Sequence, residues 1–327
     1  MSRRAIATRF GRFDLHRFGA PYADAFALVR GDAGGGAPLL ARVHSACMTS
    51  EFLGARDCDC AEQLANALEA IAAAGRGVLV YLMQEGRGAG LLAKARDRMM
   101  VQAHGERITT FEAFERMGLP RDRRSYEAVP LLLAALGIGA PLRLLTHNPE
   151  KRARLEGVGV CVLETLPLPA SHSPWNAHYL AAKASHGHAL TAPAAAGARL
   201  PERVTWFEPQ VLARLPRFLR AARYLLPVEA GWLHASVYWD RAHSRERFLL
   251  EPLAASRHGK AAPSLVQPQA LVDRLPLAPP GPTQRAWART ARALVTHAAG
   301  RALVLGPDEP EALDPETLQL LEASEAA

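Results

Sequence analysis

Alternating hydrophobic and polar positions mark the first part of the chain as a set of short strands. The alternation runs through residues 5–30, which predicts strands joined by turns, and a further strand is predicted in the segment LLARVH at residues 39–44. Between residues 62 and 74 the apolar side chains recur at helical spacing, and glycines follow that helix. The unbroken apolar run GVLVYLM, residues 77–83, predicts a buried strand.

Two stretches combine a strand, a turn and a helix. In the first, the buried strand continues into QEGRGAG at residues 84–90 and then into the helix LLAKARDRMM. Glycines let a backbone approach an anion and a helix N-terminus offers free N–H groups, although many such turns are only tight connections. The second unit, LRLLTHNPEKRARLEGVGV, precedes a last strand at residues 158–167. Such units predict an α/β or α+β fold in which helices flank a mixed sheet.

The segment between these two units predicts two helices separated by a charged loop. Thr110 is the N-cap candidate of the first helix, and the second, apolar helix ends at Leu136. The loop between them, residues 119–126, has the sequence LPRDRRSY. A charged loop of this kind is usually solvated, so its composition alone assigns it no function.

A linker divides the chain. Residues 191–200, TAPAAAGARL, are small residues with a proline, so we expect a first domain over residues 1–190 and a second over residues 201–327. The second is expected to be a smaller α+β domain. It contains a predicted hairpin, formed by GWLHASVYW and residues 246–250, a helix over residues 284–299, a strand ALVL and a polar C-terminal helix.

A further helix is predicted in this second domain between Pro209 and Leu226. It would carry four arginines spaced three apart, which are Arg214, Arg217, Arg220 and Arg223. A basic face of this kind is usually solvated, and the alternative is a surface for anions or nucleic acid. No motif in this domain indicates a catalytic role.

Composition narrows the class of protein only moderately. The 327 residues include 49% hydrophobic residues, enough for a full core, and the net charge is +7. This charge favours anionic partners such as nucleotides, but an arginine-rich chain can be basic without functional meaning. The N-terminus lacks the apolar segment of a signal peptide, and the longest apolar run, residues 128–142, is broken by prolines and glycines. We therefore expect a cytoplasmic protein with no membrane partner.

Three of the four cysteines, Cys47, Cys58 and Cys60, lie within fourteen residues of one another. An extended segment would point the Cys58 and Cys60 thiols to one side, and Cys47 could fold back to the same point. Three thiolates and one open position describe a catalytic rather than a structural zinc site. Buried core thiols or a disulfide are the alternatives. His44 is a weaker ligand candidate, since a lone histidine beside a strand more often makes a structural hydrogen bond.

The cysteine region resembles that of the GTP cyclohydrolase II family, which opens guanine in the first committed step of riboflavin synthesis. The family pattern is RVHSEC, a ten-residue gap and CDCGxQL; this chain has RVHSAC, the same gap and CDCAEQL. QEGRGAG resembles the family's QEGRGIGL, the loop matches its D-x-R-x-Y, and WNAHYLAAK resembles its N-x-x-Y-L-x-x-K. The resemblance covers residues 5–190, and Ala46, Asp57 and Ala61 replace the usual Glu, Arg and Gly.

The resemblance implies that GTP is the substrate, that formate and pyrophosphate leave, that Mg²⁺ accompanies the triphosphate, and that the chain forms a homodimer. It implies one catalytic Zn²⁺ on Cys47, Cys58 and Cys60, a catalytic pair of Asp122 and Arg124, and substrate contacts from Arg42, Val43, His44, Ser45, Ala46, Gln63, Glu85, Gly86, Arg87, Thr110, Thr146 and Lys151. In the family the arginine is the proposed nucleophile toward the α-phosphorus. A guanidinium stays protonated in proteins, however, so an electrostatic clamp is the ordinary role.

One departure from the family pattern concerns a catalytic phenol. The family has K-x-x-A-Y-x-L-Q-D-x-G where this chain has KARDRMMVQAHG. Aligned from Lys94, Arg98 takes the tyrosine position; aligned from Gln102 and Gly105, Met99 does. Either way the hydroxyl that could relay a proton is missing. We therefore hypothesise that deformylation is impaired and that a formamidopyrimidine nucleotide accumulates.

Two other function classes remain open on the sequence. A non-catalytic nucleotide sensor would keep the pocket, but it would have no need of an open zinc site. A nucleic-acid-binding protein with a structural zinc is supported by net charge alone, and salt-dependent binding would be its signature. We expect nucleic acid not to be a partner.

Overall fold

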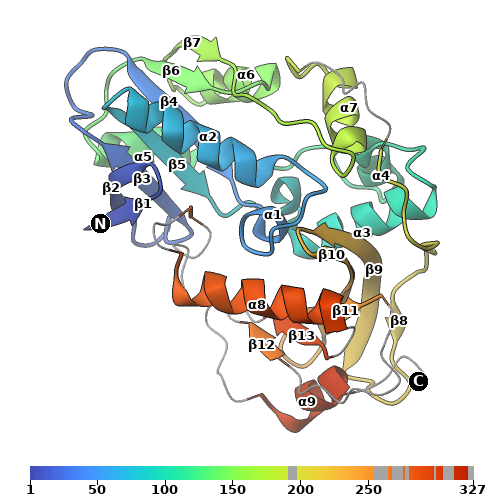
Figure 1. Cartoon of the computed structure of the whole chain (residues 1–327). Coiled ribbons are helices and arrows are strands. Elements are labelled where there is room, and N and C mark those ends of the chain that lie inside the picture. Colours follow the sequence, from blue (N-terminus) through green and yellow to red (C-terminus); the bar gives the residue numbers. More distant parts are fainter. Residues whose placement is uncertain are drawn as a thin grey trace.

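The computed structural model describes residues 1–190, 197–253, 264–266, 275–276, 280–297, 300–304 and 313–322. Its first part is a seven-stranded mixed sheet with the order β1-β2-β3-β5-β4-β6-β7 (Figure 1). The strands are β1 (Ser2–Thr8), β2 (Gly11–Arg17), β3 (Ala25–Arg30), β4 (Leu39–Ser45), β5 (Gly77–Leu82), β6 (Leu142–Leu145) and β7 (Val162–Leu166). Strands β1, β2, β3 and β5 pair antiparallel, whereas β5, β4, β6 and β7 pair parallel.

Helices cover both faces of this sheet. They are α1 (Met48–Glu51), α2 (Cys60–Ala73), α3 (Gly90–Ala103), α4 (Thr110–Arg116), α5 (Ala128–Ala135), α6 (Pro149–Gly157) and α7 (Ala177–Ser185). Leu64 and Leu68 of α2 pack against one face of the sheet. Leu132 of α5 and Leu155 of α6 pack against the other. The predicted α/β fold with flanking helices is confirmed.

The second part is built on a six-stranded sheet with the order β12-β13-β11-β10-β9-β8. The elements are β8 (Gln210–Val211), β9 (Phe218–Val228), β10 (Gly231–Asp240), β11 (Arg245–Pro252), β12 (Ser264–Val266), α8 (Pro282–His297), β13 (Ala302–Val304) and α9 (Pro315–Glu322). The predicted hairpin is β10 and β11, and the two helices and the strand at residues 302–304 are also present.

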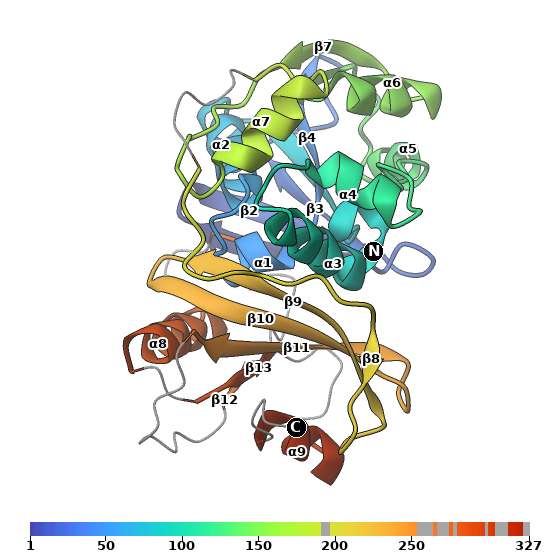
Figure 2. The same cartoon turned by 90° about the vertical axis from the view of Figure 1, so that its right-hand side faces the viewer.

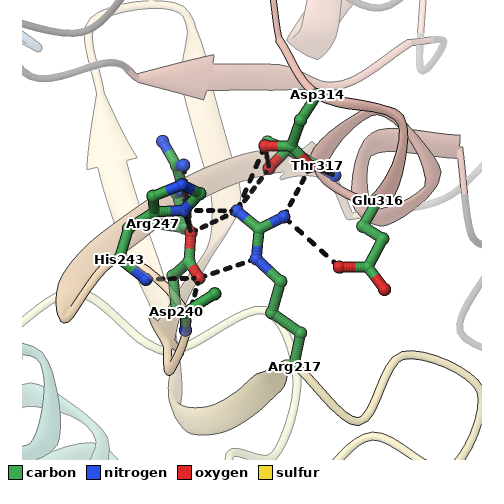
Figure 3. A network of polar contacts seen from close by, with 8 residues as sticks. Arg217, Asp240, His243, Arg247, Asp314, Glu316 and Thr317 are labelled. Carbon is green, nitrogen blue, oxygen red and sulfur yellow. Dashed lines mark hydrogen bonds and ion pairs between the residues drawn. The ribbon is translucent and has the colours of Figure 1, made fainter.

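The helix predicted between Pro209 and Leu226 is wrong, because this segment forms β8 and β9. Tyr224 pairs with Ala235 and Leu226 with Leu233 of β10, so the two side chains, two positions apart in a strand, lie on the same face. The four arginines therefore form no helical stripe. Arg217 instead lies in a network that joins Asp240 and Arg247 of the hairpin to Asp314, which precedes α9, and to Glu316 and Thr317 in its first turn (Figure 3).

Three smaller expectations also need correction. The N-cap of α4 is Thr109, not Thr110, and its side chain forms a capping box with Glu112. Cys60 is the first residue of α2, so it does not continue an extended segment from Cys58. The last strand of the first sheet is shorter than predicted, Val162–Leu166. Of the predicted linker, residues 191–196 lie outside the described part, and residues 197–200 have no regular structure.

The second sheet packs directly on the first part of the chain. In Figure 2, β9 and β10 pass next to α1 and α3. Met99 of α3 is fully buried in one cluster with Tyr224 of β9. Both ends of the Gln102 amide bond the backbone of Leu225, at 2.7 Å and 2.8 Å. The strand thereby gains a side-chain partner from α3, and the two parts share one hydrophobic core.

No helix among the described residues is long and apolar enough to cross a membrane.

Candidate functional site

Three thiols meet at the end of β4, at the turn before α2 and at the start of α2. The Sγ atoms of Cys47, Cys58 and Cys60 lie within 4.8 Å of one another, and those of Cys47 and Cys58 are 3.8 Å apart. No other group of three or more His, Cys, Asp or Glu side chains in the described ranges is close enough to hold a metal ion. Contacts with Cys47 and Cys58, together with burial, raise the pKa of the Cys60 thiol. Three thiolates this close need a cation, which fits a thiophilic metal with one open position.

A lysine and a carboxylate support the thiol cluster from α3 and from the glycine-rich turn. Lys94 Nζ lies 3.0 Å from Cys47 Sγ and donates to Thr49 Oγ1 at 2.7 Å and to Glu85 Oε1 at 2.9 Å. The other Glu85 oxygen accepts from the N–H of Met48 at 2.6 Å. The turn at residues 84–90 is therefore tied to the residue that follows Cys47.

His44 does not join the thiol cluster. Its Nε2 lies 2.8 Å from Glu51 Oε1, and that carboxylate also accepts from the Cys47 N–H at 3.0 Å and from the Tyr81 hydroxyl. Burial, with Arg42 next in importance, lowers the pKa of His44 well below its usual value. The structural role anticipated for a lone histidine beside a strand is the one observed.

Two cavities that share lining residues adjoin the thiols. A small one of about 90 Å³ is lined by all three cysteines, and a larger one of about 770 Å³ shares Cys60 with it. Ser45, Arg87, Arg124 and Tyr179 also line both cavities. A ligand in the large cavity can therefore extend to the thiol cluster.

The large cavity is strongly cationic. Six cationic side chains line it, against two acidic ones, Asp122 and Glu150. The cations are Arg42, Arg87, Arg121, Arg124, Lys151 and Lys183. Burial, and then the charges of Arg42 and Arg124, lower the pKa of Lys151 well below its usual value. The unbalanced charge indicates a binding site for a multiply charged anion.

Asp122 and Arg124 form a two-pronged ion pair at the border of both cavities. Arg124 Nε lies 3.0 Å and 3.1 Å from the two carboxylate oxygens, and its Nη2 makes a further short contact. Burial alone would raise the pKa of Asp122, but the Arg124 hydrogen bonds outweigh it and lower that pKa. Asp122 in turn raises the pKa of Arg124 despite burial. Both groups are thus held in their charged forms.

The arginine loop depends on a glycine in the neighbouring turn. Gly88 has φ +80°, and a Cβ there would lie 2.8 Å from the carbonyl carbon of Arg123 and 2.9 Å from the nitrogen of Arg124. Arg123 N–H also donates to Arg87 O at 2.9 Å. The two loops approach this closely only because residue 88 has no side chain.

A chain of buried polar groups connects α7 to the thiol turn. Lys183 Nζ lies 2.6 Å from Asp59 Oδ1, and Gln63 donates to Asp59 Oδ2 at 2.6 Å. Arg42 completes the chain, since its Nη2 donates to Gln63 Oε1 at 2.5 Å and its Nη1 to Leu145 O at 2.8 Å. Asp59 lies between two cysteines of the cluster, so this chain fixes the turn that carries them.

The comparisons with known proteins agree with this arrangement. The family model for GTP cyclohydrolase II matches residues 1–167. The GTP cyclohydrolase-2 of Hahella chejuensis is 45% identical over 189 residues, covering 57% of this chain and 89% of that relative. That of Azotobacter vinelandii is 46% identical over 188 residues, covering 57% and 88%. The Pseudomonas syringae pv. tomato protein is 42% identical, covering 57% and 90%.

The chain belongs to the GTP cyclohydrolase II family. The family model's match ends before β8, so the second sheet is an extension beyond it. The side chains that match family motifs converge on the two cavities. The small cavity is lined by Ser45, Ala46, Cys47, Cys58, Cys60, Glu85, Gly86, Arg87, Thr110 and Arg124, and the large one by Arg42, His44, Ser45, Cys60, Gln63, Arg87, Asp122, Arg124, Thr146 and Lys151.

Val43 is the one predicted site residue that lines neither cavity. Its side chain lies in the sheet core, and its carbonyl accepts from Lys151 Nζ at 2.9 Å. Thr110 contacts Asp97 Oδ2 through its hydroxyl at 2.8 Å. Thr146 accepts from the Asn148 N–H at 3.1 Å, which shapes the turn before α6.

Of the two residues that the alignments offer for the position of the family's tyrosine, only Arg98 lines a cavity. Met99 points into the second sheet, where it is fully buried, whereas Arg98 lines the small cavity. Arg98 Nε lies 3.0 Å from Asp57 Oδ2. Asp57 stands where the family has arginine, so two departures that are forty-one residues apart in the sequence meet as one ion pair.

Several residues at the site were not among those predicted from the sequence, namely Asp59, Lys94, Asp97, Tyr179 and Lys183, whereas Arg98 was one of two candidates for the tyrosine position. Tyr179 and Lys183 are the tyrosine and lysine of the family's closing motif and lie one turn apart on α7. Their i, i+4 spacing placed them on one face of a helix, and this was the available signal. Nothing in the sequence indicated that this face meets the cysteines.

Proposed function

We propose that this protein is a zinc-dependent GTP cyclohydrolase of type II that hydrolyses the imidazole ring of the guanine in GTP and releases formate and pyrophosphate. The observation that carries the proposal is the continuity of a three-thiol cluster with a cationic cavity. A nucleoside triphosphate has the matching asymmetry, because its base is neutral and its phosphates carry several negative charges. Cys47, Cys58 and Cys60 would hold zinc, which supplies Lewis acidity and lowers the pKa of a water molecule.

The chain's own residues orient the nucleotide. Lys151, Arg42 and Lys183 supply positive charge to the phosphate end of the large cavity. Glu85 and Lys94 fix the glycine-rich turn against the thiols, so that the base is presented to the reacting centre. These contacts would orient the nucleotide relative to the thiol cluster. Orientation of two reactants supplies a large part of the rate enhancement in a two-reactant step.

Arg124 acts in this proposal as a charged clamp on the phosphates. Its pairing with Asp122 keeps the guanidinium protonated, and a protonated guanidinium has no free electron pair for attack on phosphorus. Asp122, ion-paired to Arg124 and approached by Arg154 at 3.4 Å, aligns this clamp. Mg²⁺ on the triphosphate and a homodimer belong to the same proposal. A cytoplasmic location belongs to it as well, because zinc ligation needs free thiols and the cytosol keeps thiols reduced.

One incubation tests the proposal. Purified protein with zinc, magnesium and GTP should release one pyrophosphate per GTP consumed, and mass spectrometry should show a ring-opened nucleotide monophosphate. Removing the metal with a chelator should abolish turnover, and Cys58→Ser should lower both zinc content and turnover. Intact GTP after incubation with the zinc-loaded protein would overturn the proposal. The sensor alternative expects binding without turnover, and the nucleic-acid alternative expects salt-dependent nucleic-acid binding.

A second candidate is an enzyme that stops at the formamidopyrimidine nucleotide. It is favoured by Arg98 in the small cavity, where the family places a phenol. Another phenol, that of Tyr179, lines the same cavity, but the family motif has that tyrosine as well as the missing one. The candidate predicts substantially less formate than pyrophosphate from the wild type.

A double variant gives the sharpest test of the second candidate. Asp57→Arg with Arg98→Tyr restores the family residue at both positions without leaving either partner of the ion pair unmatched. Formate per pyrophosphate should rise toward one. Met99→Tyr is the matched control, because Met99 lies outside the cavity and its replacement should affect stability instead. Equal formate and pyrophosphate from the wild type would rule this candidate out.

A further inference from the structure

Arg98 is a buried arginine whose donors are not all used. Its side chain is 9% exposed and lines the small cavity beside the thiols. Its Nε is ion-paired to Asp57, although the alignment is outside hydrogen-bond geometry. No hydrogen bond among the described residues involves its Nη1 or Nη2. A guanidinium that is enclosed this well normally directs its terminal N–H groups at an acceptor.

The surroundings hold the guanidinium in place and charged. Its Cζ lies 5.0 Å from the centre of the Tyr179 ring. Burial disfavours its charge, but Asp57 and Asp97 outweigh burial and raise the pKa of Arg98. The group is thus a fixed double donor at the wall of the cavity next to the metal ligands.

The chemistry of a guanine base limits what such a donor can meet there. In the proposed function, C8 of the base lies at the thiol cluster. Its ring neighbours are N9, which carries the sugar, and N7, which is an acceptor. The next acceptor on the same edge is O6, and arginine binds O6 and N7 together as a two-pronged contact. Adenine presents an amino donor in place of O6, which a guanidinium cannot accept.

We propose that Arg98 is a specificity-determining residue that donates to N7 and O6 of the purine, so that this protein selects 6-oxopurine nucleotides over adenine nucleotides. The inference rests on the proposed function. Asp57 is its positioning residue, because it fixes the guanidinium from the side away from the base. The same donor draws electron density from the imidazole ring, which favours attack at C8.

The test compares GTP with 7-deaza-GTP, which differs from it only at position 7, and with ATP, which lacks O6 and also the 2-amino group. Binding of GTP to the zinc-loaded protein is measured by stopped flow. 7-Deaza-GTP, which lacks the N7 acceptor, and ATP are then added as competitors. The wild type should bind GTP about tenfold or more tightly than 7-deaza-GTP, and ATP more weakly still. In Arg98→Met the preference for GTP over 7-deaza-GTP should fall to about onefold, because GTP loses the contacts at N7 and O6 whereas 7-deaza-GTP loses only the weaker contact at O6.

Further variants separate recognition from folding. Arg98→Lys keeps a positive partner for Asp57 but loses the two-pronged fork, so it should fold normally and still lose most of the GTP preference. Arg96→Met is the matched control, since Arg96 lies on the same helix and bonds Ala221 O and Glu208 outside both cavities. It should keep the wild-type ratio. Zinc content and melting temperature are measured for every variant.

The outcomes are distinguishable. If the wild type binds GTP and opens its ring but Arg98→Lys and Arg98→Met retain the full preference for GTP over 7-deaza-GTP, the inference is overturned and the proposed function stands. Equal weakening of both nucleotides would assign Arg98 a structural role and also overturn the inference. If the wild type neither binds nor consumes GTP, the proposed function fails, and this inference fails with it.

Discussion

Lys183 of α7 and Asp59 of the thiol turn form a buried ion pair, with Nζ 2.6 Å from Oδ1. The two residues are far apart in the sequence, and their side chains are 9% and 0% exposed. Asp59 separates Cys58 from Cys60, so the position of two thiols depends on a helix that follows the residues matched by the family model. α7 therefore supports the thiol cluster directly.

Lys183→Met should weaken zinc binding. The variant leaves Asp59 buried without its cation, and loss of a partner next to metal ligands typically costs at least about tenfold in metal affinity. Competition with a chromogenic chelator measures the change. Arg143→Met is the control, because it breaks an ion pair whose members are 45% and 44% exposed, and it should leave zinc affinity unchanged. Wild-type affinity in Lys183→Met would contradict the role given to α7.

Gly88→Ala should impair turnover without removing any functional side chain. The added methyl would meet the backbone of Arg123 and Arg124 and push the arginine loop away from the cavity. A shift of about 1 Å in a substrate-orienting group can lower kcat/KM about a hundredfold. Gly118→Ala is a matched control, since Gly118 also has a positive φ, +71°, but nothing lies within 4 Å of its added Cβ. Similar losses of kcat/KM in both variants would mean that backbone strain alone is responsible.

Nucleotide binding should take up protons through Lys151. Burial and the neighbouring arginines lower its pKa in the free protein, whereas a triphosphate beside it would raise that pKa again. Protons are therefore taken up at pH values between the lowered and the restored pKa. Calorimetry with 7-deaza-GTP in buffers of different ionisation enthalpy measures the uptake. Lys151→Met should reduce it, and uptake equal to that of the wild type would exclude Lys151 as the source.

The Arg217 network should make the second sheet sensitive to acid. Burial tends to raise the pKa of Asp240, but hydrogen bonds from Arg217, His243 and Arg247 lower it below its usual 3.8 (Figure 3). A folded-state pKa below the unfolded value gives stability that is present above about pH 4 and is lost as the pH falls toward the folded pKa. Unfolding by denaturant at pH 7 and at lower pH measures this loss.

Asp240→Asn should remove most of that pH dependence and cost about 3 kcal/mol at pH 7, because it leaves buried arginines without their carboxylate. Asp14→Asn is the control, since its ion pair with Arg3 is exposed and its loss should matter little. A wild-type acid profile in Asp240→Asn would show that other carboxylates govern the transition.

The motifs that match the family could be located from the sequence because each depends on local chemistry. Cys58 and Cys60 are two positions apart, and the glycine-rich turn follows an apolar strand, so both features are visible without any long-range contact. The segment at residues 209–226 failed for the opposite reason. Its arginine spacing suggested a helix, but pairing with β10 and packing on α3 determined its conformation, and neither partner is visible locally.

The sequence by itself determined the mixed sheet with its flanking helices, the membership of the first part in the family, and the set of thiols, because periodicity and motif spacing are local properties. Only the tertiary structure decided that Arg98, not Met99, lines the cavity, and that Asp57 is its partner. It also decided that α7 anchors the thiol turn and that the second sheet shares a core with α3. These features depend on which surfaces bury one another, and burial is a property of the whole chain that no single segment encodes.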